Sequence, residues 1–191
     1  TFLHKIAHQI AQDCNFNFTK CTIVLPNKRA RLFLIEALKT TSDKTFFAPE
    51  IISVEDLIGN ISKMHTLSSV EQLFEFYEVY KTITPISAQQ DFEQFSNWAK
   101  MLLQDFNEID RYLLKPSHVF DYLKNIDDIN HWSVKAEDRS MLIAKYLTFW
   151  DQLPTYYTAY KKHLLVQNCG YQGLVYRCAV EGIDAYMSEN S

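Results

Sequence analysis

The spacing of apolar residues changes character about one third of the way along the chain. From Ser68 onward, apolar residues recur at steps of three and four, the period of an amphipathic α-helix, and no strand pattern is found. The longest such series comprises Phe92, Phe95, Trp98, Leu102, Phe106, Ile109 and Leu113. Only 4 glycines and 5 prolines occur among the 191 residues, which argues against a turn-dense all-β fold. The chain is therefore expected to be predominantly helical.

The first 66 residues instead alternate helical and strand patterns. Helices are predicted over 2–13, over 28–39 and from 54 to about 63, with strands over 21–25 and 48–54. The second helix is apolar nearly all round after its first turn, so it is expected to be buried on several sides. The spacing Ser53-x-x-Asp56 predicts a capping box at the third. The order strand, helix, strand predicts a parallel pair joined by a right-handed crossover.

Residues 67–191 are expected to form a larger, all-helical second domain. Ser68-x-x-Glu71 predicts a capped helix to about residue 82, and Ser87-x-x-Gln90 predicts the start of the long helix that follows. Further helices are predicted over 117–124, 126–131, 137–166 with an interruption at Pro154, and 174–187 after Gly170 and Gly173. The expected fold class is α/β over 1–66, a small parallel sheet with crossover helices, followed by a helical subdomain over 67–191.

Charge is distributed unevenly along the chain. Residues 1–39 contain six Lys and Arg against two Asp and Glu, a net charge of +4. The remaining residues contain thirteen against twenty-one, a net charge of −8. The total of −4 argues against a protein that coats nucleic acid generally. Any contact with a polyanion is therefore expected to be local and to lie within residues 1–39.

Three cations stand where the second predicted helix begins. Residues 23–34 read IVLPNKRARLFL, which places Lys28, Arg29 and Arg31 in the first helical turn. A helix dipole favours negative charge there, by ~0.3–1 kcal/mol for each exposed charge. A phosphate bound at the end of the preceding strand would be favourable for both the dipole and the side chains. The alternative, slightly favoured by spacing alone, is that these side chains extend into water or pair with Glu50 or Asp56.

Other chemical patterns are weaker. His4 and His8 have the spacing of a zinc pair, but no third ligand follows, so a surface pair is expected. Asp105, Glu108 and Asp110 lack the lysine and strand framework of a two-metal nuclease, and a solvated or interface face is expected. The aromatic run over 149–160 has helical spacing, which favours core packing over base stacking. The four cysteines lack CxxC spacing and are expected to be reduced, partly buried thiols.

No glycine-rich phosphate loop, nucleophile elbow or nucleophile–base pair is found. No catalytic, cofactor-binding or metal-binding residue is therefore predicted. No run of 18 apolar residues and no secretory leader is present, so a cytoplasmic location is expected.

Two segments resemble motifs of superfamily 1 helicases of the UvrD/Rep type. PNKRA, after the first strand, is similar to motif Ia, and ISVEDL, after the second, is similar to motif Ib. In those enzymes both motifs belong to domain 1A, and the helical domain 1B follows. Over most of the chain, the order of several segments resembles the N-terminal region of AddB-type proteins, in the branch labelled PD-(D/E)XK nuclease family proteins in Bacteroidetes. These segments are VLPNKRARLFLIEAL, FAPEIISVEDLI, LFEFYEVYK, MLLQDFNEIDRYL and YQGLVYR.

The resemblance implies a 1A-like fragment over 1–66 and a 1B-like region over 67–191. It implies a non-catalytic DNA-binding and scaffolding part of an ATP-dependent helicase–exonuclease that acts in double-strand break repair by recombination. The implied partners are DNA, as a single strand or duplex end, and an AddA-like helicase subunit. ATP belongs to that motor partner and Mg²⁺ to the nuclease of the parent family. Only Thr1 precedes the first helix, where a Walker A loop would lie, so ATP hydrolysis is not expected of these residues.

The resemblance also implies which residues contact the DNA backbone. Asn27, Lys28 and Arg29 occupy the position of motif Ia, and Arg31 and Ser53 are weaker candidates. The alternative function is a helical protein-interaction module, in which the acidic, aromatic-rich second part docks a helicase partner subunit. An autonomous nuclease that uses DFNEID is the least favoured hypothesis.

Overall fold

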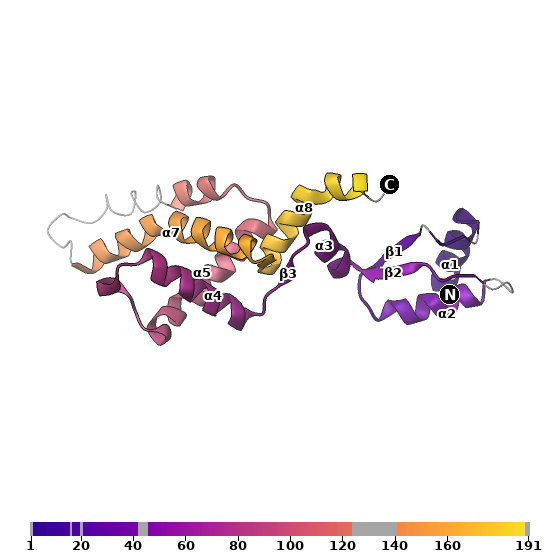
Figure 1. Ribbon diagram of the computed structural model, residues 1–191, viewed down its shortest axis with the longest axis horizontal. Helices are drawn as coiled ribbons and strands as arrows, with labels where there is room; N and C mark the ends of the chain where they lie inside the picture. Colours follow the sequence, from indigo (N-terminus) through magenta and orange to yellow (C-terminus); the bar gives the residue numbers. More distant parts are fainter. Residues whose placement is uncertain (1, 16, 20, 42–45, 124–140, 190–191) are drawn as a thin grey trace. The chain divides into compact units, whose positions relative to one another are not determined.

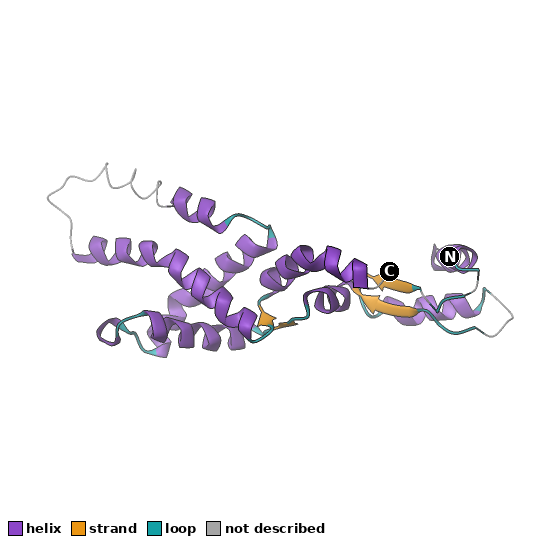
Figure 2. Ribbon diagram, turned by 45° about the horizontal axis from the view of Figure 1, so that its top comes forward, coloured by secondary structure: helices purple, strands orange, loops and turns teal. Residues whose placement is uncertain are grey.

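The computed structural model describes residues 2–15, 17–19, 21–41, 46–123 and 141–189. The chain is predominantly helical, and the strands of the described part form two short parallel pairs (Figures 1 and 2). This confirms the expected helical fold with a small parallel sheet. The chain divides into unit 1 (Thr1–Asn60) and unit 2 (Ile61–Ser191). The division precedes the expected boundary after residue 66 because a strand at 65–66 pairs within unit 2.

Unit 1 contains a two-stranded parallel sheet and its helices. The elements are α1 (Phe2–Asp13), β1 (Thr22–Leu25), α2 (Ala30–Lys39), β2 (Glu50–Ser53) and α3 (Val54–Ser62), whose last two residues belong to unit 2. β1 pairs in parallel with β2, from Thr22 beside Glu50 to Leu25 beside Ser53, as predicted. α2 lies in the connection between the two strands.

The core of unit 1 lies between α1, α2 and the sheet. Ala7 and Ala11 of α1 are buried, and their small side chains allow α2 to pack closely. The other buried apolar residues of this core are Phe18, Leu34, Ala37, Leu38 and Ile51. The expectation that α2 is buried on several sides is wrong, because Leu32 and Phe33 are 74% and 66% exposed.

Unit 2 is helical apart from one short strand pair. Its elements are β3 (His65–Thr66), α4 (Ser69–Ile83), the 3₁₀ turn η1 (Ile86–Ala88), α5 (Phe92–Arg111), a helical segment over 116–123, α7 (Met141–Val166), β4 (Cys169–Gly170) and α8 (Gln172–Glu189). α5 packs against α4 and α8, and α4 packs against α7 (Figure 1). Phe76 lies in the core, with its ring 5.1–6.0 Å from the rings of Phe95, Phe106, Tyr156 and Tyr160. Core packing of this part of the aromatic run is therefore confirmed.

Several predictions for unit 2 need correction. It is not wholly helical, because β3 pairs in parallel with β4. The long helix is not capped by Ser87, which lies in η1; Asp91 instead accepts the N–H of Gln94 at 2.8 Å. α7 continues through Pro154 without the expected interruption, and Gly173 lies inside α8 rather than before it. The helix predicted over 126–131 and the start of the one at 137 lie outside the described residues. None of the described helices is long and apolar enough to cross a membrane.

Candidate nucleic-acid interface

The carboxyl ends of β1 and β2 lie at the same edge of the sheet of unit 1. Leu25 and Ser53 are the last residues of the two strands and are partners in the parallel register. The segment PNKRA follows β1, and α3 follows β2 directly. This edge is where open α/β sheets bind ligands, so the two motif-like segments are brought to one place by the strand pairing.

The turn before α2 contains Lys28 and Arg29, and Arg31 lies in the first turn of α2 itself. The Asn27 side chain accepts the N–H of Ala30 at 3.1 Å, and α2 begins at Ala30 rather than at the predicted residue 28. Arg29 has helical backbone angles, with φ −68° and ψ −34°, although it precedes the helix. Asn27 therefore acts as a local cap for the backbone, which leaves the side chains of Lys28 and Arg29 exposed at the edge of the sheet.

Lys28 is neutralised by the protein itself. Its Nζ lies 2.8 Å from Oδ1 of Asp56 in the first turn of α3, and the two side chains are 74% and 38% exposed. This is one of the pairings that the alternative interpretation predicts. The pKa of Asp56 is lowered to about 2, chiefly by the hydrogen bond from Lys28 and then by those from the hydroxyl and N–H of Ser53.

Ser53 also contacts Asp56, but its side chain is buried. Its hydroxyl donates to Oδ2 of Asp56 at 2.8 Å and accepts the N–H of Asp56 at 3.2 Å. The N–H of Ser53 donates to the same carboxylate, so the predicted capping box is confirmed. Ser53 is 1% exposed, and its side chain therefore supports Asp56 rather than facing a ligand.

Arg29 and Arg31 differ from Lys28. Both are exposed, and neither guanidinium group makes a hydrogen bond or ion pair with any residue that the structure describes. Arginine presents five donors in a planar fork that matches the oxygens of a phosphate. The candidate interface therefore contains two exposed guanidinium groups, without acidic partners among the described residues, and a lysine that is paired with Asp56.

The acids of the DFNEID segment do not converge on one site. Asp105 is exposed and lines an apolar cavity of about 450 Å³ beside α5, where partial burial raises its pKa. Asp110 is fully buried, so the expectation of a solvated or interface face is wrong for this residue. The histidines His4 and His8 are exposed on α1, and His8 contacts Gln12 at 3.0 Å. No group of metal-ligating side chains is found in the described ranges.

Asp110 is the centre of a buried polar cluster that the sequence did not reveal. Oδ1 of Asp110 lies 2.6 Å from Nε of Arg177 and accepts the hydroxyl of Tyr157 at 2.7 Å, while Oδ2 accepts the hydroxyl of Tyr171. Burial and the adjacent carboxylate raise the pKa of both tyrosines. Arg177 also donates to the carbonyl oxygens of Ile109 and Leu114 near the end of α5. The cluster ties α5, α7 and α8 together.

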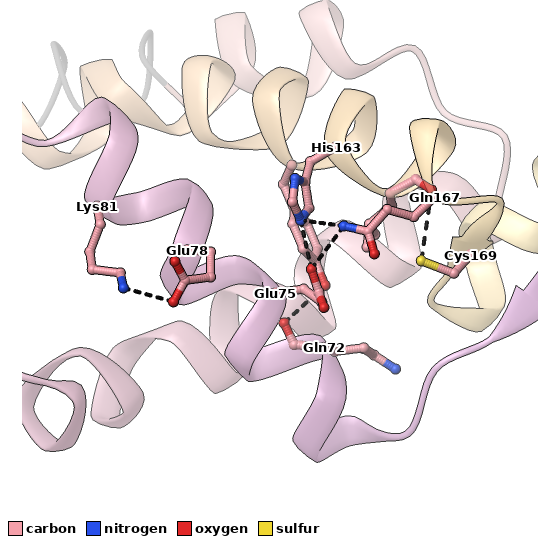
Figure 3. A network of polar contacts seen from close by, with 9 residues as sticks. Gln72, Glu75, Glu78, Lys81, His163, Gln167 and Cys169 are labelled. Atoms are coloured by element: carbon pink, nitrogen blue, oxygen red, sulfur yellow. Dashed lines mark hydrogen bonds and ion pairs between the residues drawn. The ribbon is translucent and has the colours of Figure 1, made fainter.

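A second polar network joins α4 to α7 (Figure 3). Nε2 of His163 lies 2.6 Å from Oε2 of Glu75, and Gln167 donates to the same oxygen at 3.1 Å. The hydrogen bond with His163 is the main cause of a lowered Glu75 pKa. Cys169 lies nearby in the figure, but its thiol donates to the carbonyl of Leu164, and burial raises its pKa. The Cys169 thiol is therefore bonded to a backbone carbonyl and not to the His163 imidazole, unlike the nucleophile and base of a cysteine–histidine catalytic pair.

Comparison of the chain with protein families, curated proteins and solved structures gives no match.

Proposed function

We propose that unit 1 binds the sugar–phosphate backbone of DNA through Arg29 and Arg31, with Asn27 and Lys28 beside them. In this proposal the chain is the N-terminal, non-catalytic DNA-binding and scaffolding part of an AddB-like helicase–nuclease that acts in double-strand break repair. One observation carries the proposal. Two exposed guanidinium groups follow β1 at the ligand-binding edge of a parallel sheet, and neither has an acidic partner among the described residues.

The local geometry supports a backbone contact rather than recognition of bases by hydrogen bonding. Guanidinium groups bind phosphate oxygens in pairs, and such contacts give affinity and register without sequence specificity. The Asn27 side chain accepts the N–H of Ala30, and Ser53 is buried. Both residues therefore fix the local backbone of the proposed interface and do not contact DNA through their side chains. Lys28 contributes less than an unpaired lysine because Asp56 already neutralises it.

In the proposed parent complex, DNA binding, strand cleavage and ATP hydrolysis belong to different parts. Strand cleavage with Mg²⁺ belongs to the nuclease part of the parent protein, and ATP hydrolysis belongs to an AddA-like motor subunit. Unit 1 supplies affinity and position along the strand. The helicase 1A-like and 1B-like assignments of the two parts of the chain belong to the same proposal.

Salt dependence of binding tests this function. Two phosphate contacts on a single strand predict that log K falls with log salt concentration with a slope of about −1.4, since each contact contributes about −0.7. We expect fluorescence anisotropy with a labelled oligothymidylate to show this slope for the natural chain. The double variant Arg29→Gln, Arg31→Gln should bind more weakly and with a slope near zero.

Lys39→Gln is the matched control for this experiment. Lys39 is an exposed cation at the other end of α2 and is paired with Glu36 at 3.4 Å. Its removal should leave both the affinity and the slope unchanged. Equal affinity of the natural chain and the double arginine variant would refute the proposed interface.

A second candidate function, docking of a helicase partner subunit by unit 2, is favoured by one surface. Val180, Ile183 and Met187 of α8 are 53%, 45% and 59% exposed and follow the i, i+3, i+7 spacing of a helix–helix contact. Pull-down with an AddA-like subunit from nuclease-treated lysate tests this function. Capture that is lost in the variant Ile183→Asp would support docking, whereas capture only in the presence of DNA would contradict it.

A further inference from the structure

We propose that the cavity beside α5 in unit 2 binds a small organic cation of the arylalkylamine class, with Asp105 as the counter-ion of its ammonium group. The cavity has a volume of about 450 Å³ and is lined by residues of α5, of the helical segment over 116–123 and of α7. The inference goes beyond the proposed function and does not depend on the DNA interface in unit 1.

The walls of the cavity suit an apolar ligand body. Ten of the twelve described residues that line it are apolar, and the volume is within the range of about 300–1,000 Å³ that is usual for sites of small organic molecules. Four of the lining residues are buried and belong to the core of unit 2: Leu102, Phe106, Ile109 and Leu153. The cavity is therefore shaped by the packed core, and burial of an apolar body in it is favourable.

The charged groups of the cavity have one sign. Asp105 and Glu108 both line it, and as residues i and i+3 of α5 they lie on one face of the helix. No lysine, arginine or histidine is among the described residues of the lining. A cationic group on the ligand is therefore complementary to this cavity, whereas an anionic group would be repelled.

Asp105 is the acid that is available to a ligand. Glu108 accepts the side-chain N–H of Asn107 at 3.4 Å, but the Asp105 carboxylate makes no hydrogen bond or ion pair with any residue that the structure describes. Partial burial at the cavity raises the pKa of Asp105, and no neighbouring cation opposes this effect. A carboxylate that loses water without gaining a partner is stabilised by an ammonium group, which donates up to three hydrogen bonds.

Aromatic rings in the lining favour an aromatic ligand body. Trp98, Phe106 and Phe120 line the cavity. Nε1 of Trp98 donates to Oε1 of Gln90 at 2.8 Å, so the orientation of the indole is fixed before a ligand binds. Contacts between aromatic rings are worth more than the area that they bury, so an aryl group gains more here than an alkyl chain of the same size.

Three probes with the same apolar body test the inference: phenylbutylamine, which is cationic at neutral pH, the uncharged phenylbutanol, and the anionic phenylbutyrate. We expect isothermal titration calorimetry with the natural chain to give a Kd of about 0.1–1 mM for the amine, as for other ligands of this size. The alcohol should bind about two- to fivefold more weakly, because an ion pair with an exposed carboxylate contributes at that level, and the anion more weakly still. Asp105→Asn should reduce the affinity for the amine to that for the alcohol and leave the alcohol unchanged.

Two further variants complete the experiment. Glu93→Gln is the matched charge control, because Glu93 is an exposed acid of the same helix that does not line the cavity, and it should keep the preference for the amine. Val119→Phe places a larger side chain in the cavity and should weaken the binding of all three probes. Circular dichroism melting identifies which variants remain folded.

The outcomes decide both the site and the counter-ion. Equal affinity of the natural chain for the amine and the alcohol, or a preference for the amine that survives in Asp105→Asn, would overturn the role of Asp105. Absence of saturable amine binding well above the expected Kd, or affinities unchanged in a folded Val119→Phe variant, would overturn the site. Self-association of the natural chain that Val119→Phe removes would assign the cavity to a contact between copies and would also overturn it. DNA binding by Arg29 and Arg31 is unaffected by any of these results.

Discussion

The Nε atom of Arg177 lies 2.6 Å from Oδ1 of Asp110, and the Asp110 side chain has no exposure to solvent. Asp110 is the second-last residue of α5, and Arg177 comes from α8. The carboxylate also accepts tyrosine hydroxyls from α7 and from the turn before α8, and Nζ of Lys161 in α7 lies 3.9 Å from Oδ1. The Asp110–Arg177 pair therefore links α5 to α8, and the Tyr157 hydroxyl links α7 to the same carboxylate.

Removal of one partner of the buried Asp110–Arg177 pair should destabilise unit 2 strongly. Asp110→Asn removes the negative charge and leaves Arg177, whose side chain is only 11% exposed, with the exposed Glu181 at 3.9 Å as its remaining counter-ion. Breaking a buried pair in this way costs about 3–5 kcal/mol in the free energy of unfolding. Urea titration followed by circular dichroism measures this change. The control Asp105→Asn, at an exposed acid on the same helix, should change stability by less than about 0.5 kcal/mol. Similar losses for the two variants would contradict the central role of Asp110.

The approach of α8 to α5 depends on the absence of a side chain at Gly173. A Cβ atom there would lie 2.1 Å from the backbone oxygen of Asn107 and 2.9 Å from the N of Arg111. Gly173→Ala should therefore force the helices apart and cost about 1–3 kcal/mol. Gly182→Ala is the control in the same helix, since its Cβ would have no neighbour closer than 3.7 Å. Because alanine favours a helix by up to about 1 kcal/mol over glycine, this control should raise the melting temperature. A stabilising Gly173→Ala would refute the close contact.

The Glu75–His163 network should make unit 2 sensitive to acid. The hydrogen bond with His163 lowers the pKa of Glu75 in the folded state, and the unfolded chain has the ordinary value of about 4.3. Between the lowered pKa of the folded state and the ordinary pKa of about 4.3, the unfolded state therefore binds more protons than the folded state, and stability rises with pH. The contribution of Glu75 to the free energy of unfolding is complete above about pH 4.3 and is lost as the pH falls through the lower pKa of the folded state.

Urea titration of the natural chain and of Glu75→Gln across this range measures the contribution. The two should differ most near pH 7, and the difference should shrink toward pH 3. Glu78→Gln, which removes a surface carboxylate paired with Lys81 on the same helix, should keep the natural pH profile. A constant difference between the natural chain and Glu75→Gln at every pH would show that the carboxylate charge is not responsible.

Asp56 should limit the affinity of the proposed interface for DNA. Its carboxylate neutralises Lys28 and, with a pKa of about 2, stays ionised at any pH suitable for a binding assay. Asp56→Asn keeps an acceptor for the Ser53 cap but releases Lys28 to contact a third phosphate. We expect tighter binding to an oligothymidylate and a salt slope steeper by about 0.7. Glu55→Gln, at the exposed neighbouring acid, should change the slope less. Weaker binding by Asp56→Asn would contradict the proposed arrangement.

The features that the sequence predicted correctly are those decided by residues close in the chain. The Ser53–Asp56 and Ser68–Glu71 capping boxes form because each involves a side chain and a backbone group three residues apart. The capping box predicted at Ser87 was wrong, although it also rested on residues three apart. Asp91 is also a strong N-cap residue, and it stands directly before the first apolar residue of α5, so the helix begins there.

The features that the sequence did not predict depend on distant pairings. Arg177 lies 67 positions after Asp110 in the numbering, and no local pattern links a surface-type arginine to a buried acid. Strands β3 and β4 contain two residues each, which is too short for a strand period to appear. The cations were identified from sequence, but the distinction between Lys28, which is paired, and Arg29, which is not, required the position of Asp56 in space.

The position of the Asp110 partners along the chain has a consequence for synthesis. Tyr157 and Tyr171 follow Asp110 by 47 and 61 residues, and Arg177 comes later still. On a ribosome, α5 therefore emerges before α7, which supplies Lys161 at 3.9 Å from Oδ1, and before α8, which supplies Arg177. An unpaired buried charge is costly, so we expect this carboxylate to stay hydrated until those helices follow. The core of unit 1 contains only residues up to Ile51 among its buried members, so the nascent chain can complete it far earlier. We therefore expect folding during translation to be ordered, with the core of unit 1 formed before α8 brings Arg177 to Asp110.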